Sequence, residues 1–312
     1  MRIAVLSLTH MVWAGPVAAH DPAPMQPNIL WQAWSFDPLV LGLLLAAAWG
    51  YRRGTRRLWA RAGQWRGIGG EHVSAFVLGL AVVVVALVSP LDRLGATLLS
   101  AHMAQHGLLV TTAPVLLLLG KPGVAFAWAL PEGWSRRSLA AVAWRPLARA
   151  GLWLCRPFPA ATLHGLTLWL WHAPALFDAA VEREWLHTLE HASFFGAALL
   201  FWRMVLDARS GERIGLALAG AFATLMHGGL LGGLIIMAPR PLYRWYEGHT
   251  EPWGLTALDD QRLAGLLMWV PMGLVYFGAC LGLAGRLVMP PDHPSRLVGS
   301  IDGAPRALRD LR

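Results

Sequence analysis

The sequence predicts an all-α integral-membrane protein, a bundle of seven transmembrane helices. Of its 312 residues, 56% are hydrophobic and only 14% are charged, whereas charged residues make up about 25% of soluble domains. Seventeen tryptophans suit helix ends that are anchored at a membrane surface. The net charge of +8 comes from basic residues scattered between apolar runs. We therefore expect a lipid bilayer as the partner, and no nucleic acid.

The first 19 residues have the pattern of a secretory signal peptide. Arg2 is followed by a short apolar stretch and by small residues that end at Ala19. The apolar stretch is too short to cross a bilayer, which takes about 20 residues. We expect a signal peptide at 1–19 and a periplasmic segment at 20–35. The membrane domain follows at 36–287, and a cytoplasmic tail at 288–312.

Within the membrane domain, apolar runs separated by polar or basic segments mark the expected helices in order. Each run is long enough, alone or with its flanks, to cross most of a hydrocarbon core. The seven expected spans are 36–51, 73–89, 94–119, 159–177, 185–206, 214–238 and 262–287.

The basic residues give these spans a direction, because Lys and Arg collect on the cytoplasmic side of a membrane. One set of alternating segments, which includes 52–72, 120–158 and the tail, holds 20 of the 26 basic residues. The other side keeps only Arg93, Arg183, Arg240, Arg244 and Arg262. The N-terminus is therefore expected in the periplasm and the C-terminus in the cytoplasm of a multi-pass bacterial inner-membrane protein.

Five histidines fall inside the apolar spans at one expected depth: His102, His106, His172, His187 and His191. Counted from Leu94 at about 1.5 Å per residue, the first two would lie about 12 and 18 Å from the periplasmic face. Four of the five form i,i+4 pairs, which place both imidazoles on one face of a helix. Ionisable residues inside a membrane are costly and mark functional sites. The pattern predicts a metal site open to the outer face.

Ligand chemistry narrows the metal. Imidazole suits copper, zinc and iron, and thioethers favour Cu(I). The two cysteines, Cys155 and Cys280, are expected away from the histidines and form no CxxC motif, so a thiol site is not predicted. Buried histidines can also be purely structural, and methionines often fill gaps in a core. Further ligands or supporting residues are expected among His227, Met103, Asp178, Glu190, Asp259 and Asp260; for the last two, capping of a helix is the alternative.

Four motifs resemble the CtaG family of polytopic membrane assembly factors for cytochrome c oxidase. They appear in order as SAHMAQHGLL at 100–109, LWHAPALFDAA at 170–180, LHTLEHASFFGAALLFW at 186–202 and LDDQRLAGLLMWVPMG at 258–273. The resemblance covers residues 30–287. It assigns the family's histidine motifs to the five histidines above, and its acidic–Gln motif to Asp259, Asp260 and Gln261.

The sequence shows no nucleophile–base pair and no phosphate-binding loop, so we do not expect an enzyme. The resemblance implies a role in the assembly of cytochrome c oxidase. The protein would bind copper transiently at the histidines and help to supply it to cytochrome c oxidase subunits. Two alternatives remain open on the residues alone: a membrane non-haem di-iron oxygenase, which also uses HxxxH motifs, and a b-haem electron carrier with axial histidines.

Overall fold

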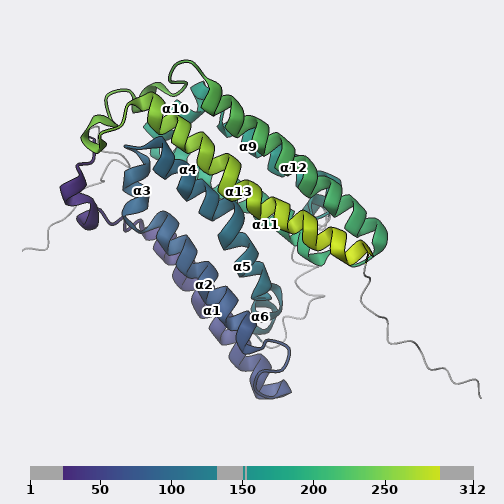
Figure 1. Cartoon of the computed structure of the whole chain (residues 1–312). Coiled ribbons are helices and arrows are strands. Elements are labelled where there is room, and N and C mark those ends of the chain that lie inside the picture. Colours follow the sequence, from purple (N-terminus) through teal and green to yellow (C-terminus); the bar gives the residue numbers. More distant parts are fainter. Residues whose placement is uncertain (1–23, 132–149, 152, 289–312) are drawn as a thin grey trace, which may run out of the picture.

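The computed structural model describes residues 24–131, 150–151 and 153–288, and over these ranges the chain is α-helical without a β-strand (Figure 1). The expected signal peptide at 1–19 lies outside the described residues. So does the expected tail at 288–312, apart from Val288.

Five helical segments are long and apolar enough to cross a membrane, so this is a multi-pass membrane protein. They are α2 (Gly70–Leu87), the continuous segment of α4 (Leu99–Gly107), η2 (Leu108–Thr112) and α5 (Ala113–Leu119), then α11 (Glu184–Asp207), α12 (Gly211–Met237) and α13 (Ala257–Val288). The shorter described elements are η1 (Pro27–Gln32), α3 (Pro90–Gly95), α6 (Pro122–Ala129), α10 (Pro174–Glu182), η3 (Arg244–Tyr246) and η4 (Glu251–Trp253).

The two other expected spans correspond to α1 (Pro38–Ala62) and α9 (Pro157–Trp171). Helix α1 begins where the Asp37 carboxylate accepts hydrogen bonds from two backbone N–H groups of the first turn. It continues to Ala62 and ends at Gly63, whose φ of +93° favours glycine. The expected boundary at residue 51 is therefore wrong. The arginines from 52 to 61 lie on the last turns of a helix and not in a loop.

The expected third span also needs correction, because it is broken near its start. The short helix α3 ends at Gly95, and Leu98 adopts an extended conformation before α4 begins at Leu99. Measured along α4, His102 lies about 4.5 Å from the start of the helix and His106 about 10.5 Å. Both histidines are thus nearer to the helix end than the sequence predicted.

The expected fourth span, 159–177, ends earlier than predicted. Helix α9 stops at Trp171, and His172 caps it. Pro174 starts the separate helix α10, and the residue before a proline is disfavoured in a helix. Ala173 is accordingly extended, with φ −64° and ψ 123°.

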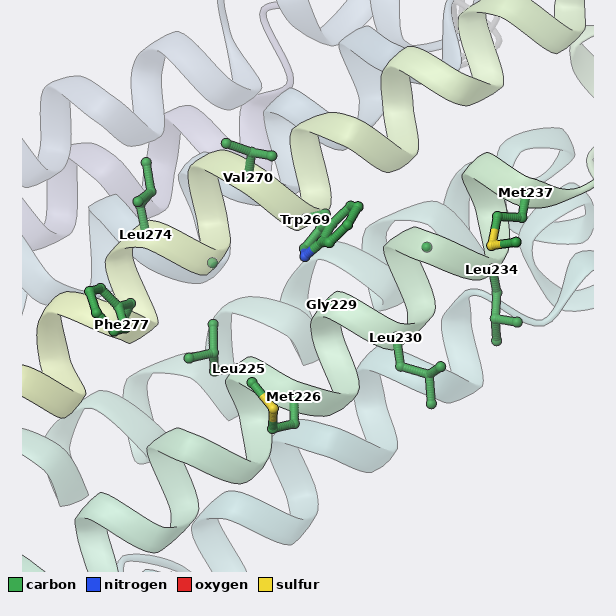
Figure 2. A pocket seen from close by; sticks show the side chains of 12 residues that line it. Leu225, Met226, Gly229, Leu230, Leu234, Met237, Trp269, Val270, Leu274 and Phe277 are labelled. Carbon is green, nitrogen blue, oxygen red and sulfur yellow. The ribbon is translucent and has the colours of Figure 1, made fainter.

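Helices α12 and α13 pack along most of their length (Figure 1). Gly232 and Gly265 face each other so closely that a Cβ on Gly232 would lie 2.9 Å from the carbonyl oxygen of Gly265. On their lipid-facing side the two helices leave an apolar groove lined by residues such as Met226, Trp269 and Phe277 (Figure 2).

The α4–η2–α5 segment lies centrally and contacts α2, α11 and α13. Its middle turn, η2, is a π-helix, a feature that is frequent near functional sites. The indole of Trp202 on α11 donates a hydrogen bond of 2.8 Å to the carbonyl oxygen of Val110 in this turn. The irregular turn is thus anchored to the helix that carries the second pair of histidines.

Candidate metal centre

Helices α4 and α11 bring their two histidine pairs into contact. His102 and His106 project from α4, and His187 and His191 project from α11, each pair one turn apart. The ring centroid of His102 lies 5.2 Å from that of His187, and the centroid of His106 lies 5.2 Å from that of His191. All four residues are buried. Together with Glu190 they form what we call the histidine cluster.

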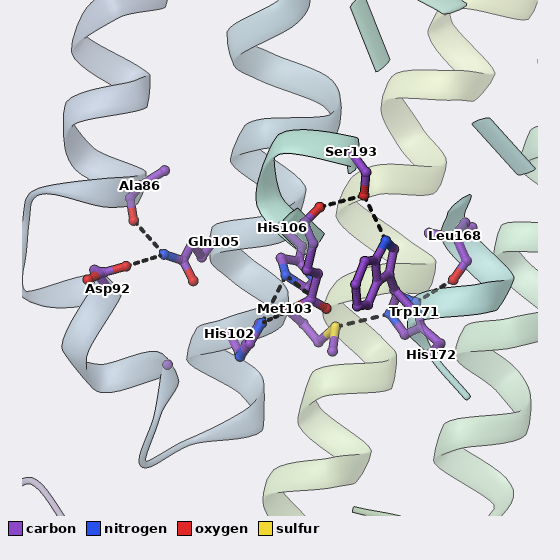
Figure 3. A network of polar contacts seen from close by, with 12 residues as sticks. Ala86, Asp92, His102, Met103, Gln105, His106, Leu168, Trp171, His172 and Ser193 are labelled. Carbon is purple, nitrogen blue, oxygen red and sulfur yellow. Dashed lines mark hydrogen bonds and ion pairs between the residues drawn. The ribbon is translucent and has the colours of Figure 1, made fainter. Parts of the chain in front are cut away.

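The two histidines of α4 point their Nε2 atoms at each other, 2.9 Å apart (Figure 3). Two nitrogens bound to one metal ion at about 2.0–2.1 Å stand about 2.9–3.4 Å apart. The pair therefore already has the separation of neighbouring ligands on one ion.

Tyr246 sets the orientation of His102. Its hydroxyl donates a hydrogen bond of 2.8 Å to the carbonyl oxygen of Gly95 and lies 3.1 Å from Nδ1 of His102. Because the hydroxyl proton is used on Gly95, the His102 Nδ1–H donates to the tyrosine oxygen. This tautomer leaves the Nε2 lone pair directed into the cluster, as metal-binding histidines require.

Glu190 is the carboxylate of the cluster and is fully buried. Its two oxygens lie 3.8 Å from Nε2 of His102 and 3.7 Å from Nε2 of His106. Neither oxygen accepts a hydrogen bond from the part of the chain that the structure describes. A buried carboxylate is costly unless a cation or a proton compensates it. This position therefore suits a cation.

Donor atoms of four residues, His102, His187, Glu190 and His191, lie within 4.8 Å of one another. Such a set of imidazoles and one carboxylate could hold copper, zinc or iron.

His172 lies at the edge of the cluster beside a methionine. Its Nδ1 donates 2.7 Å to the carbonyl oxygen of Leu168, which leaves Nε2 as the acceptor nitrogen. That Nε2 lies 3.4 Å from Sδ of Met103 on α4 (Figure 3). The ring centroid of His172 is 6.3 Å from that of His106. The fifth predicted histidine therefore lies beside the cluster, with the thioether of Met103 next to it.

Asp260 supports the site by capping α4. Its carboxylate accepts hydrogen bonds from the backbone N–H of Leu99 (2.6 Å) and of Ser100 (3.2 Å), and from the Ser100 hydroxyl. A carboxylate at a helix N-terminus also stabilises the helix dipole. Asp260 therefore fixes the start of the helix that carries His102, whereas Asp259 is exposed and pairs with Thr256 and Arg262.

On the other side of α4, Gln105 donates hydrogen bonds of 2.8 Å both to the carbonyl oxygen of Ala86 and to Asp92 (Figure 3). Asp92 also accepts a hydrogen bond from Ser35. Burial raises the pKa of the Asp92 carboxyl, and these hydrogen bonds partly oppose the shift.

The segment after α12 closes over the cluster. Asp178 accepts hydrogen bonds from the backbone N–H groups of Arg244 and Trp245, and burial raises its pKa. Tyr243 donates to the carbonyl oxygen of His172, 3.1 Å away. Asp178 thus holds the loop at 244–245 in place over the cluster. These hydrogen bonds go to the backbone of the loop and not to the histidine rings. Tyr243 and Tyr246 were missed by sequence reasoning, because nothing in a loop sequence shows which helix its tyrosines will reach.

His227, expected as a further ligand or supporting residue, faces helix α9. Its ring packs against Gly165 of α9, next to His164, and it does not belong to the four-residue donor group. The sequence placed it in the span expected at 214–238 but could not show which neighbouring helix it faces.

These features define a multi-pass α-helical membrane protein with a buried histidine–carboxylate cluster at one end of its bundle. Residues 49–289 match the family described as cytochrome c oxidase caa3 assembly factor (Caa3_CtaG), and the chain belongs to this family.

Curated relatives include uncharacterized proteins of Mycobacterium bovis and Mycobacterium tuberculosis, each 28% identical over 275 residues. A protein of Mycobacterium leprae is 26% identical over 276 residues. Each alignment covers 84% of this chain, and the chain spans about 40% of the length of these relatives. No solved structure matches the chain.

Proposed function

We propose that this protein binds copper at the histidine cluster and helps to deliver it to cytochrome c oxidase during assembly of that enzyme. The family is described as an assembly factor for the oxidase, and the copper centres of that enzyme would receive the ion. The observation that carries the proposal is the buried group of three histidines and Glu190, with donor atoms within 4.8 Å of one another and His106 beside them.

Copper suits the donor set for two reasons. Imidazole nitrogens bind copper well, and the thioether of Met103 beside His172 adds a soft donor that favours Cu(I). The other donors of the site are neutral imidazoles, so the single carboxylate of Glu190 balances the charge of one monovalent ion. Neighbouring ligands on two helices can be exchanged one at a time, which a protein that passes its metal on requires.

The geometry favours copper over the two alternatives. A b-type haem takes one axial ligand on each side of its ring, whereas four donors here converge on one small volume. A di-iron oxygenase needs many histidines or several carboxylates to hold two metal ions, whereas three histidines and the single carboxylate of Glu190 converge here, with His106 beside them. The proposed role is therefore metal transfer without catalysis.

The proposed topology has seven spans with the cluster facing the periplasm. Helices α4, α11 and α13 begin at the cluster end of the bundle, and α2, α9 and α12 finish there. The few basic residues of this end contrast with the arginines at the far ends of α1, α11 and α12. This asymmetry supports a periplasmic cluster and a cytoplasmic C-terminus in the bacterial inner membrane.

A deletion strain tests the proposal. Without this protein, oxidase subunits should still be made, but the purified oxidase should contain less copper and have lower activity. Excess copper in the medium should restore part of the activity by mass action. Wild-type protein should restore full loading, and the His102→Ala/His106→Ala variant should not.

The matched control for this experiment is His72→Ala. His72 lies at the start of α2, where its ring accepts a hydrogen bond from the Gly69 N–H, far along the bundle from the cluster. This control should restore copper loading. Oxidase with a full copper content from the deletion strain would overturn the delivery role.

A further inference from the structure

A second pair of histidines lies deeper in the bundle than the histidine cluster. His164 projects from α9 and is 1% exposed, eight residues and about 12 Å before His172. His227 projects from α12, and its ring packs on Gly165, the neighbour of His164. The His227 ring therefore faces the turn of α9 that carries His164.

Each of these histidines keeps one ring nitrogen without a partner. Nε2 of His164 lies 2.8 Å from the hydroxyl of Tyr276, but its Nδ1 is buried and has no hydrogen bond among the described residues. Nδ1 of His227 is in the same state. By contrast, Nδ1 of His172 donates to the carbonyl oxygen four residues earlier. Two orphaned polar atoms inside a membrane are costly unless a ligand satisfies them.

The surroundings hold both rings in fixed positions. Phe201 stacks on the His164 ring, with centroids 4.6 Å apart and an interplanar angle of 22°. Trp202 stacks in turn on Tyr276 at 5.4 Å. A Cβ on Gly165 would lie 3.1 Å from Nε2 of His227, so the absence of a side chain there lets the His227 ring approach α9.

Side chains of α13 reach from the cluster to this pair. Met268, Met272, Tyr276 and Cys280 follow one another at i,i+4 spacing, and all four are buried on the same face of the helix. The side chain of Met272 packs against Gly107, the residue that follows His106. A line of thioether, phenol and thiol groups thus runs from the cluster to the second pair and past it.

We propose that His164 and His227 form a second, interior binding site for Cu(I), with Tyr276 as a positioning residue that orients His164. Neutral imidazole nitrogens suit copper, and Cu(I) accepts two-coordinate binding, so a pair of nitrogens is enough. The step is an exchange of ligands on Cu(I) without a change of oxidation state. The choice of metal rests on the proposed function, whereas the site itself rests on the two unpartnered nitrogens.

Copper counting on the purified full-length protein tests the inference. Cu(I) is added in the presence of a chromogenic Cu(I) chelator, and bound copper per chain is measured for four proteins. The wild type should bind one Cu(I) more than the His164→Ala/His227→Ala variant. The His102→Ala/His106→Ala variant should keep an interior Cu(I), which disappears when the His164 and His227 substitutions are added. His72→Ala should match the wild type.

Two further readouts separate binding from folding. X-ray absorption of the copper in the His102→Ala/His106→Ala variant should show two nitrogen neighbours. Tyr276→Phe, which keeps the ring and its stacking, should weaken the interior site by about 10–100-fold, as is typical for residues that orient a ligand. It should leave the cluster unchanged.

Unchanged copper content in the His164→Ala/His227→Ala variant overturns this inference and leaves the histidine cluster intact. If copper is lost only with the His102 and His106 substitutions, the interior pair is structural. If no variant and no wild-type sample binds Cu(I), the proposed function fails as well.

Discussion

Replacing Glu190 by glutamine asks whether the buried carboxylate serves to hold a cation. The substitution nearly keeps the shape of a fully buried side chain, replaces one oxygen by an NH2 group and removes the charge. Oε2 lies 3.8 Å from Nε2 of His102, and Oε1 lies 3.7 Å from Nε2 of His106. An ion bound to those nitrogens would therefore lie close to the carboxylate.

The size of the effect follows from this distance. Unit charges about 4 Å apart attract by about 4 kcal/mol at an effective dielectric constant of about 20. Since about 1.4 kcal/mol changes an equilibrium tenfold, Glu190→Gln should raise the Kd for Cu(I) by about a thousandfold. The ion-free protein should not be destabilised, because a buried ionisable group without a hydrogen-bond partner has been removed.

Competition with a Cu(I) chelator gives the Kd, and thermal unfolding of ion-free protein in detergent gives the Tm. The matched control is Glu184→Gln, an exposed position in the first turn of the same helix. It should change neither value. An unchanged Kd for Glu190→Gln, or a lower Tm of its ion-free form, would refute the argument that the carboxylate compensates a cation.

Three other predictions follow from the structure. Reporter proteins fused after Arg66 should be cytoplasmic and those fused within 245–255 periplasmic; a periplasmic signal at Arg66 would refute the proposed topology. Asp260→Asn should lower the free energy of unfolding by about 1–2 kcal/mol, because the charged cap of α4 is lost. It should also weaken copper binding by about 10–100-fold. Thermal unfolding measures the first effect, and copper titration measures the second. Gly54→Ala should destabilise the protein by about 3 kcal/mol, because the new Cβ would lie 1.7 Å from a backbone oxygen of α6. The control Gly42→Ala, with open space around its Cβ, should be tolerated. Equal Tm values for the two variants would contradict the packing of α1 against α6.

The sequence was sufficient to predict the helical membrane class and the convergence of the two i,i+4 pairs. Helix periodicity fixes which side chains share a face, and the shared depth of His102 and His187 placed their faces side by side. Glu190 was predicted as a supporting residue for the same reason, since it lies between two histidines on α11. The structure places its carboxylate beside the Nε2 atoms of α4.

Contacts made across the chain could not be predicted in this way. Helix periodicity does not predict that Asp260 caps the distant helix α4 instead of its own helix. It also does not predict that Tyr246, which lies in a loop, reaches His102. The sequence counted the position of His102 from Leu94, whereas α4 begins at Leu99. The break at Leu98 could not be predicted, because the start of α4 depends on its contact with Asp260. His227 was expected among the further ligands or supporting residues, and its ring packs against Gly165 of α9. Its position on α12 alone leaves the choice of facing helix open.

The central claim is that the histidine cluster binds copper, and metal analysis of purified protein tests it most directly. Elemental analysis and an optical spectrum on one sample measure copper, iron and haem together. We expect copper in the wild type and in His72→Ala. The cluster's share of that copper should be lost in both His102→Ala/His106→Ala and His187→Ala/His191→Ala, while both variants remain inserted and folded. Full copper content in either double variant, or two irons per chain in the wild type, would contradict the account.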